Sequence, residues 1–204
     1  MIPVYNIEQG TDEWMALRVG NPSASKFSDI ITTKGEPSKS AKKYMQTLAA
    51  ERITGQRESS FQSASMTRGI EMEEEACALF EMLHDVTVEH VGLCYLNEDK
   101  NIIASPDGLI GLDGGIEIKC PLAHTHIDYM LKGKVPTEYF AQVQGSLYVT
   151  GREFWWFMSY FPGLPSFIVK VERDEDFISK LAIQLDSFVH GIDDVVKEIK
   201  EYEE

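Results

Sequence analysis

The stretch of this sequence best suited to chemistry joins an acidic turn to a strand that carries two ionisable side chains. Asp107 lies in the turn Ser-Pro-Asp-Gly (105–108), and Glu117 and Lys119 follow in a segment of alternating apolar residues. Because successive side chains of a strand point to opposite faces, Glu117 and Lys119 share one face of the predicted strand 115–120. A glycine-rich hairpin connection returns the chain, and this return can place Asp107 beside Glu117.

Two carboxylates at one end of a sheet suit a hard divalent cation such as Mg²⁺. A nearby lysine can lower the pKa of an attacking water or offset negative charge in a transition state. Carboxylates, cation and lysine together favour phosphodiester hydrolysis. The alternative is an ordinary turn followed by a solvated Glu-x-Lys pair, since Ser-Pro-Asp-Gly is typical of a type I turn. The combination favours a functional site because the strand is apolar on its other face.

The same residues resemble the PD-(D/E)xK nuclease signature, with Pro106-Asp107 followed by Glu117-Ile118-Lys119. The surrounding blocks narrow the resemblance to the phage lambda exonuclease (YqaJ-like) family of alkaline exonucleases. The similarity covers most of the chain. The matching blocks occur in the family's order at residues 17–20, 23–25, 68–81, 105–109, 115–121 and 141–144.

This resemblance implies a metal site. Asp107 and Glu117 match its carboxylate ligands, and the backbone carbonyl of Ile118 matches a further ligand. Glu73 matches an acidic residue on a neighbouring helix that completes the site. Lys119 matches the lysine that assists the water nucleophile. The implied cofactor is Mg²⁺, with Mn²⁺ as a substitute, at one or two ions per active site.

The resemblance also implies roles for residues on other helices. Gln142 matches an active-site glutamine, although the residues alone equally permit Gln142 and Gln144 to lie at the surface. Arg18 and Ser25 match residues that hold the 5′-terminal phosphate of DNA. The physical logic agrees, since a helix N-terminus with a serine cap and an arginine forms an anion pocket. The alternative for Ser25 is capping alone, and we expect Trp14 to pack rather than to stack on a base.

One stretch departs from the family. The arginine that follows the Lys-Cys-Pro block there is missing here, where residues 122–126 read Leu-Ala-His-Thr-His. We therefore expect the contact with the 5′ phosphate to be built differently, with His124 or His126 as candidates. A zinc site at this His-x-His pair is disfavoured because no further cysteine or histidine accompanies it.

The function implied by the resemblance is a Mg²⁺-dependent 5′→3′ exonuclease. It would degrade one strand of linear double-stranded DNA and leave a 3′ single-stranded overhang for phage recombination by strand annealing. The implied partners are linear DNA ends, a phage single-strand annealing protein and further copies of the chain in a ring-shaped homotrimer. We expect a phage- or prophage-encoded protein in the host cytoplasm. The alternatives are another PD-(D/E)xK nuclease, such as an endonuclease, and a non-catalytic DNA-end-binding recombination module.

These side chains need an α/β fold, in which helices flank a central mixed β-sheet, and the resemblance implies a restriction-endonuclease-like core. Spacing and caps predict helices at residues 14–18, 39–54, 67–84, 138–149 and 181–199, with another that starts at 23–25. Alternation predicts strands at residues 86–88, 93–95, 102–104, 115–120, 154–160 and 167–171, and residues 56–66 are expected to form a loop. We expect one nuclease domain over residues 1–204: an N-terminal helical part (1–66), a catalytic core (67–172) and a C-terminal amphipathic helix (173–204).

The helix predicted at residues 67–84 carries an apolar stripe. Met72, Ala76, Leu79 and Leu83 recur at helical spacing and line one face. Glu73 lies on the flank of this stripe, whereas the other glutamates of its cluster are expected to face solvent.

The composition limits the class of protein. The 204 residues include 19 Lys and Arg against 33 Asp and Glu, a net charge of −14. Residues 1–70 hold nine basic and seven acidic side chains, however, and residues 71–204 hold ten and twenty-six. Because this region is locally basic, the negative net charge of the whole chain does not exclude a polyanionic substrate. No apolar run is long enough for a membrane span, no signal peptide is visible, and the three scattered cysteines form neither a disulfide framework nor a CxxC pair.

Overall fold

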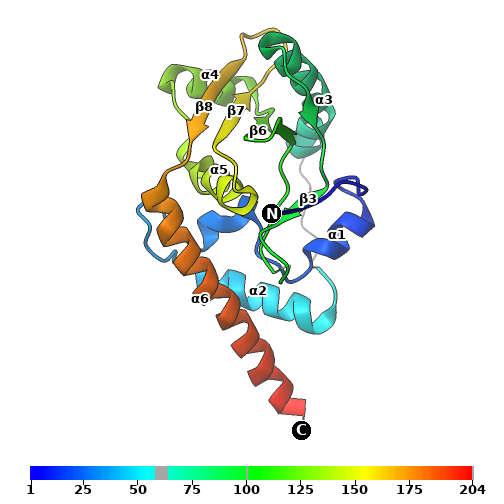
Figure 1. The fold of residues 1–204 in the computed structure, drawn as a ribbon, viewed down its shortest axis with the longest axis vertical. Coiled ribbons are helices and arrows are strands. Elements are labelled where there is room, and N and C mark those ends of the chain that lie inside the picture. Colours follow the sequence, from blue (N-terminus) through cyan, green and yellow to red (C-terminus); the bar gives the residue numbers. More distant parts are fainter. Residues whose placement is uncertain (58–63, 100, 204) are drawn as a thin grey trace.

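The computed structural model describes residues 1–57, 64–99 and 101–203, with the backbone alone for residues 64–71 and 203. Its centre is a five-stranded sheet in the order β2-β5-β6-β7-β8 (Figure 1). The strands are β2 (Val88–Glu89), β5 (Gly108–Ile110), β6 (Gly114–Lys119), β7 (Phe154–Ser159) and β8 (Phe167–Glu172). β6 and β7 run parallel, and the other neighbouring pairs are antiparallel. The predicted mixed sheet is therefore confirmed.

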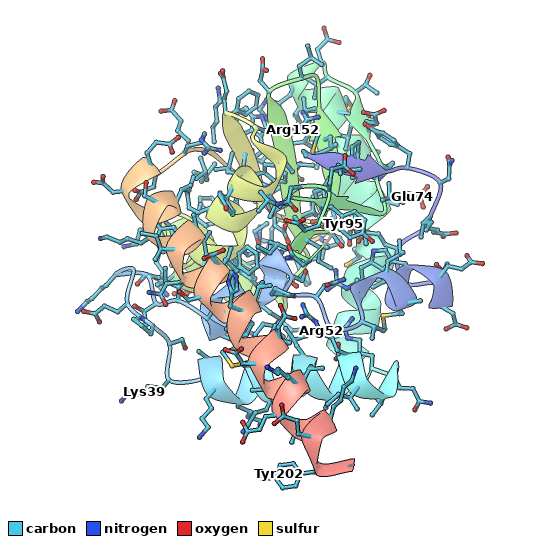
Figure 2. The ribbon with its side chains drawn as sticks, turned by 60° about the horizontal axis from the view of Figure 1, so that its bottom comes forward. Lys39, Arg52, Glu74, Tyr95, Arg152 and Tyr202 are labelled. Atoms are coloured by element: carbon cyan, nitrogen blue, oxygen red, sulfur yellow. The ribbon has the colours of Figure 1, made fainter. Side chains whose placement is uncertain are left out.

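A second sheet has three antiparallel strands in the order β1-β3-β4. The strands are β1 (Ile2–Val4), β3 (Leu93–Tyr95) and β4 (Ile103–Ala104). Figure 2 shows Tyr95 of β3 near the middle of the molecule, where it is buried. Neither β1 nor β5 was predicted from the sequence, because each has only three residues and one of them is a proline or a glycine, which are depleted in strands.

Helices cover both faces of the five-stranded sheet. They are α1 (Asp12–Arg18), α2 (Ala41–Thr54), α3 (Ala64–His84), α4 (Ala123–Lys132), α5 (Thr137–Thr150) and α6 (Glu175–Lys200), with the 3₁₀ helices η1 (Ala24–Asp29) and η2 (Glu201–Glu203). On one face, Ala76 and Phe80 of α3 share a buried cluster with Ile116 of β6. On the other face, Leu147 of α5 shares the largest cluster with Phe157 of β7.

Five of the six α-helices match the predictions. The Thr11 hydroxyl caps α1 and accepts a hydrogen bond from the Trp14 backbone N–H at 3.3 Å. Gly55 ends α2 with φ of 66°, in the left-handed region that favours glycine. α4 was missed, and its N-cap position holds Leu122, whose side chain cannot cap a helix.

The start of α3 differs from its predicted position. Residues 64–66 are helical rather than part of the expected loop, and residues 58–63 of that loop lie outside the described residues.

The buried face of α3 is also rotated from the predicted stripe. Ala76, Cys77 and Phe80 are buried, whereas Leu83 is 54% exposed. Glu73 is three, four and seven residues before those buried positions, which is the spacing of one helix face. Glu73 therefore lies on the buried face itself and not merely on its flank.

α6 runs from the end of β8 to the far end of the molecule and carries the C-terminus (Figure 1). Its predicted apolar spacing is confirmed, since Leu181, Leu185, Phe188 and Ile192 are all buried. α6 packs on α2, where the rings of Tyr44 and Phe188 lie 5.5 Å apart. Among the described residues, no helix combines the length and the apolar character that crossing a membrane requires.

Candidate active site

The hairpin of β5 and β6 brings two of the predicted carboxylates together. Gly108 pairs with Ile116 across the antiparallel ladder, so the residue before β5 lies beside the end of β6. The Ile118 backbone N–H donates a hydrogen bond to Asp107 Oδ2 at 2.5 Å. The predicted placement of Asp107 beside Glu117 is therefore confirmed.

A buried arginine holds this hairpin in place. Nη1 of Arg152 (labelled in Figure 2) donates to the backbone carbonyls of Ile110, Gly111 and Gly114 at 3.2, 2.9 and 2.7 Å. This contact could not be predicted from the residues alone, because backbone carbonyls can accept from an arginine whatever their side chains are. Arg152 thus stabilises the β5–β6 register that places Asp107 beside β6.

Glu117 is 1% exposed, and its two oxygens have different surroundings. Oε1 accepts hydrogen bonds from the Lys119 ammonium and from Gln142 Nε2, the latter at 2.5 Å. Oε2 is buried and meets no donor among the described residues. Burial and the nearby Asp107 carboxylate raise the pKa of Glu117 to about 7. A buried carboxylate oxygen without a donor is unfavourable unless a cation or a proton reaches it.

Glu73 of α3 is the third carboxylate. Its carboxyl group lies close to that of Asp107. Burial, together with repulsion from Asp107 and Glu117, raises the pKa of Glu73 to about 8. Burial also raises the pKa of Asp107. Three acids that repel one another in a buried place attract a cation strongly.

Lys119 balances part of this negative charge. Its Nζ donates to Glu117 Oε1 and lies 5.4 Å from the centre of the Tyr139 ring. Burial opposes the charged ammonium, but the carboxylates of Glu117 and Asp107 outweigh burial and raise the pKa of Lys119. Lys119 is therefore a fixed positive charge in this arrangement and not a proton acceptor.

The donor chemistry suits a hard divalent cation. Mg²⁺ prefers carboxylate and carbonyl oxygens, and Asp107, Glu117 and Glu73 offer these beside the unpartnered Oε2 of Glu117. Among the described residues, no group of three or more His, Cys, Asp or Glu side chains is already arranged so that it could hold a metal ion. The site therefore fits Mg²⁺ by the type of its ligand atoms, by its shared negative charge and by the buried Glu117 oxygen that accepts no hydrogen bond.

The two glutamines of α5 have separate tasks. Gln142 is half-buried and reaches Glu117. Gln144 is 2% exposed, and its amide donates to the Glu172 carbonyl and accepts from the Asp174 N–H, both at 2.9 Å. The alternative that these side chains lie at the surface is therefore wrong. Gln142 belongs to the carboxylate cluster, whereas Gln144 ties α5 to the link between β8 and α6.

Arg18 connects α1 to the turn that precedes β5. It is 8% exposed, and its Nη1 donates to Ser105 Oγ at 2.7 Å. Its guanidinium lies 4.2 Å from the centre of the Trp14 ring, and its Nε meets no acceptor among the described residues. Trp14 packs as expected, with its indole N–H donating to the Gly92 carbonyl at 2.8 Å. Ser105 is a contact that the sequence analysis missed, although it lies in a matching block.

Arg18 also lines a polar pocket of about 390 Å³ formed by residues of α1, η1 and α2 and the segments beside them. The cations in its wall are Arg18, Lys26, Lys43 and Arg57. Its two acids are already paired, Asp29 with Lys26 at 3.5 Å and Glu51 with Arg57 at 3.8 Å. We call this the Arg18 pocket, and its excess of positive charge suits an anion.

Ser25 does not cap a helix. The N-cap of η1 is Ser23, whose side chain makes no capping hydrogen bond, and η1 is a six-residue 3₁₀ helix. Ser23 lines the Arg18 pocket, whereas Ser25 is exposed and lies outside the lining, with the two hydroxyls 3.4 Å apart. The predicted serine cap is therefore wrong, because the chain turns into the short helix two residues earlier.

His126 is not available for a phosphate. It is fully buried, and its ring nitrogens bond to Ser159 Oγ at 2.7 Å and to the Pro165 carbonyl at 3.0 Å. Both nitrogens thus fix α4 against the sheet, and His126 as a substitute for the missing arginine is wrong. His124 is exposed and stays a candidate.

The chain is similar to one family model and to several proteins of known structure. A family model described as a YqaJ-like viral recombinase domain matches residues 13–153. An alkaline exonuclease from Laribacter hongkongensis has 35% sequence identity and a TM-score of 0.86, over 94% of this chain and 97% of that chain. Its complex with dAMP gives 34% identity, with the same TM-score and coverage.

A phage-related exonuclease from Haemophilus somnus 129PT shares the fold. It is 16% identical, with a TM-score of 0.70 over 88% of this chain and 96% of that chain. A search of curated proteins finds no match.

Proposed function

Because this chain belongs to the YqaJ-like viral recombinase family, we propose that it is a Mg²⁺-dependent 5′→3′ exonuclease of linear double-stranded DNA. It degrades the 5′-ended strand and leaves a 3′ overhang for recombination by strand annealing. The chain is an exodeoxyribonuclease by its family and by its likeness to an alkaline exonuclease. The observation that carries the finer proposal is the cluster of buried Glu117 with half-buried Asp107 and Glu73, beside Lys119.

The acids of this cluster and Lys119 have different roles. Asp107, Glu117, Glu73 and the backbone carbonyl of Ile118 would hold the cation. When bound, Mg²⁺ polarises the scissile phosphate and makes a water molecule a strong nucleophile at neutral pH. Lys119 stabilises the negative charge that develops on the phosphate oxygens.

Gln142 acts through Glu117. Its amide donates to Oε1 of that carboxylate, the same oxygen that Lys119 contacts. Two donors on one oxygen hold the carboxylate in one orientation and keep Oε2 available for the cation.

The Arg18 pocket supports recognition of the 5′ end. Arg18 bonds to Ser105, two residues before Asp107, so the pocket and the cluster meet at one turn. Guanidinium N–H groups bind phosphate oxygens well, often in pairs. We assign Arg18 and Ser25 to the 5′-terminal phosphate, with the Ser23 and Ser105 hydroxyls beside Arg18. A site that holds the terminal phosphate next to the cluster sets the 5′→3′ polarity.

The expected product is a 5′-phosphorylated mononucleotide. The dAMP in the complex of the Laribacter hongkongensis exonuclease is a molecule of this kind, which supports the proposal. We further propose a ring-shaped homotrimer that encircles DNA, a phage single-strand annealing protein as partner, and action in the host cytoplasm. A chain of 204 residues can hold the site, but encircling a duplex requires several copies.

One set of substrates tests the proposal. The purified protein is incubated with 5′-phosphorylated linear duplex, 5′-hydroxyl linear duplex and closed circular DNA, each with Mg²⁺ or with EDTA. We expect Mg²⁺-dependent digestion of the linear substrates, faster with the 5′ phosphate, and intact circles. A label at the 3′ end should stay in the long product while a 5′ label is released first.

The rival functions give different results. Cleavage of closed circles would identify an endonuclease and overturn the exonuclease proposal. Binding to linear ends without digestion in Mg²⁺ or Mn²⁺ would identify a non-catalytic end-binding module. Early release of the 3′ label would reverse the proposed polarity.

A further inference from the structure

Gln9 lies in the loop between β1 and α1, outside every residue assigned to the site so far. Its side-chain Nε2 donates two hydrogen bonds, to the Val91 carbonyl at 3.0 Å and to the Pro106 carbonyl at 2.9 Å. Both acceptors belong to segments without regular structure, and both bonds are partly buried. One amide therefore joins the N-terminal segment to two turns that are more than 80 residues away in the sequence.

The second of these bonds bears on the carboxylate cluster. The Pro106 carbonyl belongs to the peptide group that joins Pro106 to Asp107. A hydrogen bond to that oxygen fixes the plane of the peptide group, and the plane sets the direction in which the Asp107 side chain leaves the backbone. Residues 105–107 lie between β4 and β5, so neither ladder orients this carbonyl.

Asp107 is thus held from two sides. Gln9 fixes the backbone before it, and the Ile118 N–H fixes one oxygen of its carboxylate. Arg18, at the end of α1, also bonds to Ser105, the residue before Pro106. The turn that carries the carboxylate is therefore supported by side chains of the first 18 residues and not by sheet pairing.

The local sequence explains how Gln9 reaches inward. Gly10 has φ of 89°, a conformation that side-chain-bearing residues rarely adopt, and it turns the chain directly after Gln9. Thr11 then starts α1, with its hydroxyl donating to the Glu8 carbonyl at 2.7 Å. The sequence Gln-Gly-Thr therefore supplies a contact, a turn and a cap in succession.

We propose that Gln9 is a positioning residue that holds Asp107 ready for a divalent cation. This inference rests on the proposed function, because it assigns Asp107 to the cation. Loss of a group that orients a metal ligand costs about tenfold to a hundredfold in metal affinity. Gln9 touches neither the substrate nor the reacting atoms, so its removal should weaken cation binding and spare DNA binding.

The test compares Gln9→Met with the parent chain. Methionine has a similar length and no charge, but it cannot donate to a carbonyl. We expect the dissociation constant for Mn²⁺, measured by calorimetry without DNA, to rise about tenfold. In the nuclease assay, the Mg²⁺ concentration for half-maximal rate should rise by a similar factor. Saturating Mg²⁺ should restore most of kcat, and KM for DNA should stay within twofold.

Thr11→Ala is the matched control. It removes the cap of α1 in the same segment but leaves both bonds of Gln9 and the Asp107 turn untouched. We expect a lower melting temperature with unchanged Mn²⁺ affinity. Unchanged Mn²⁺ affinity in folded Gln9→Met would overturn the inference, and so would an equal loss of affinity in both variants.

The two proposals fail separately. If the parent binds Mn²⁺ but digests no linear DNA, the proposed function is lost. The difference in Mn²⁺ affinity between the parent and Gln9→Met still decides the role of Gln9 in that case.

Discussion

The carboxylate cluster and the Arg18 pocket meet at one turn, yet they hold charge in opposite ways. In the cluster, Glu117 is 1% exposed, and burial raises the pKa of each acid. In the pocket, Arg18 is buried, but the side chain of Lys26 is 57% exposed and that of Arg57 is 32% exposed. Glu117 is shielded from water and Asp107 and Glu73 are half-buried, whereas most of the cations are exposed to solvent.

This difference separates chemistry from recognition. Buried acids that repel one another are unfavourable until a cation compensates them, so the cluster is suited to bind a metal tightly and in one arrangement. Solvated cations exert a field over a longer distance and tolerate several positions of an anion. The cluster should therefore control turnover, and the pocket should control which DNA end is chosen.

The strongest test of this division is Lys119→Ala. Removal of one preorganised charge at a reacting phosphate should lower kcat by about a hundredfold to a thousandfold. The Kd for linear duplex, measured with Ca²⁺ or EDTA, should change by less than about threefold, because most binding energy comes from other phosphate contacts. Lys170→Ala is the control, since that exposed lysine of β8 lies over the Phe154 ring of β7. Normal turnover by Lys119→Ala would refute the assigned role.

A second test breaks the pocket instead. Arg18→Gln removes the guanidinium, and with it the bond to Ser105, but keeps an uncharged polar side chain. We expect the preference for 5′-phosphorylated over 5′-hydroxyl duplex to fall by about tenfold, since a hydrogen bond to a charged group contributes about 1.5–3 kcal/mol. The rate on 5′-hydroxyl duplex should change little.

Ser25→Ala sharpens this second test. Ser25 lies outside the lining of the Arg18 pocket, so a strong loss of phosphate preference in that variant would place the phosphate elsewhere. A small loss, beside a large one in Arg18→Gln, would locate the phosphate in the Arg18 pocket.

The two glutamines of α5 separate chemistry from stability within one helix. Gln144→Leu removes two part-buried hydrogen bonds to the backbone of Glu172 and Asp174, which should lower the free energy of unfolding by about 1–3 kcal/mol. Its kcat should stay near that of the parent. Gln142→Leu should do the reverse, with lower kcat and an unchanged melting temperature. Thermal denaturation and steady-state kinetics on both variants check this, and a similar pattern for the two would contradict the assignment.

The smallest expected effect concerns pH in the absence of metal. The folded chain holds protons on Glu73 and Glu117 up to pH values of about 8 and about 7, above the usual carboxyl range. The contribution of these two protonated carboxyls to the free energy of unfolding is complete at low pH, and it is lost as the pH rises through those values. In EDTA the melting temperature should therefore fall between about pH 5 and pH 9. Mg²⁺ should reduce this fall, and a flat profile in EDTA would show that the acids do not repel one another as described.

Local patterns carried most of the correct predictions. The alternation in β6 placed Glu117 and Lys119 on one face, because period two is visible within six residues. The spacing in α6 and the caps of α1 and α2 were equally visible. The roles of Glu73 and Gln142 came from the family resemblance, and the structure brings both side chains to the cluster.

Long-range contacts with backbone atoms could not be predicted. Gln9, Arg152 and Gln144 all bond to backbone groups, whose positions depend on the whole fold and not on the residues that carry them. The role of His126 could not be predicted either, because its partners, Ser159 and a backbone carbonyl, are also placed by the whole fold. The two missed strands have three residues each and contain a proline or a glycine, and the missed helix α4 has no side-chain N-cap to mark its start.

The parallel pairing of β6 and β7 has a consequence for the order in which the site is built. Parallel neighbours need a crossover, and here α4 and α5 fill it, so β7 follows β6 only after both helices have been made. During synthesis, the segment from Asp107 to Lys119 leaves the ribosome first, Gln142 follows, and the strand beside Glu117 comes last. A growing chain thus carries the complete motif before it carries a supported site. The site is supported on both sides of β6 only once β7 has paired with it beside Glu117.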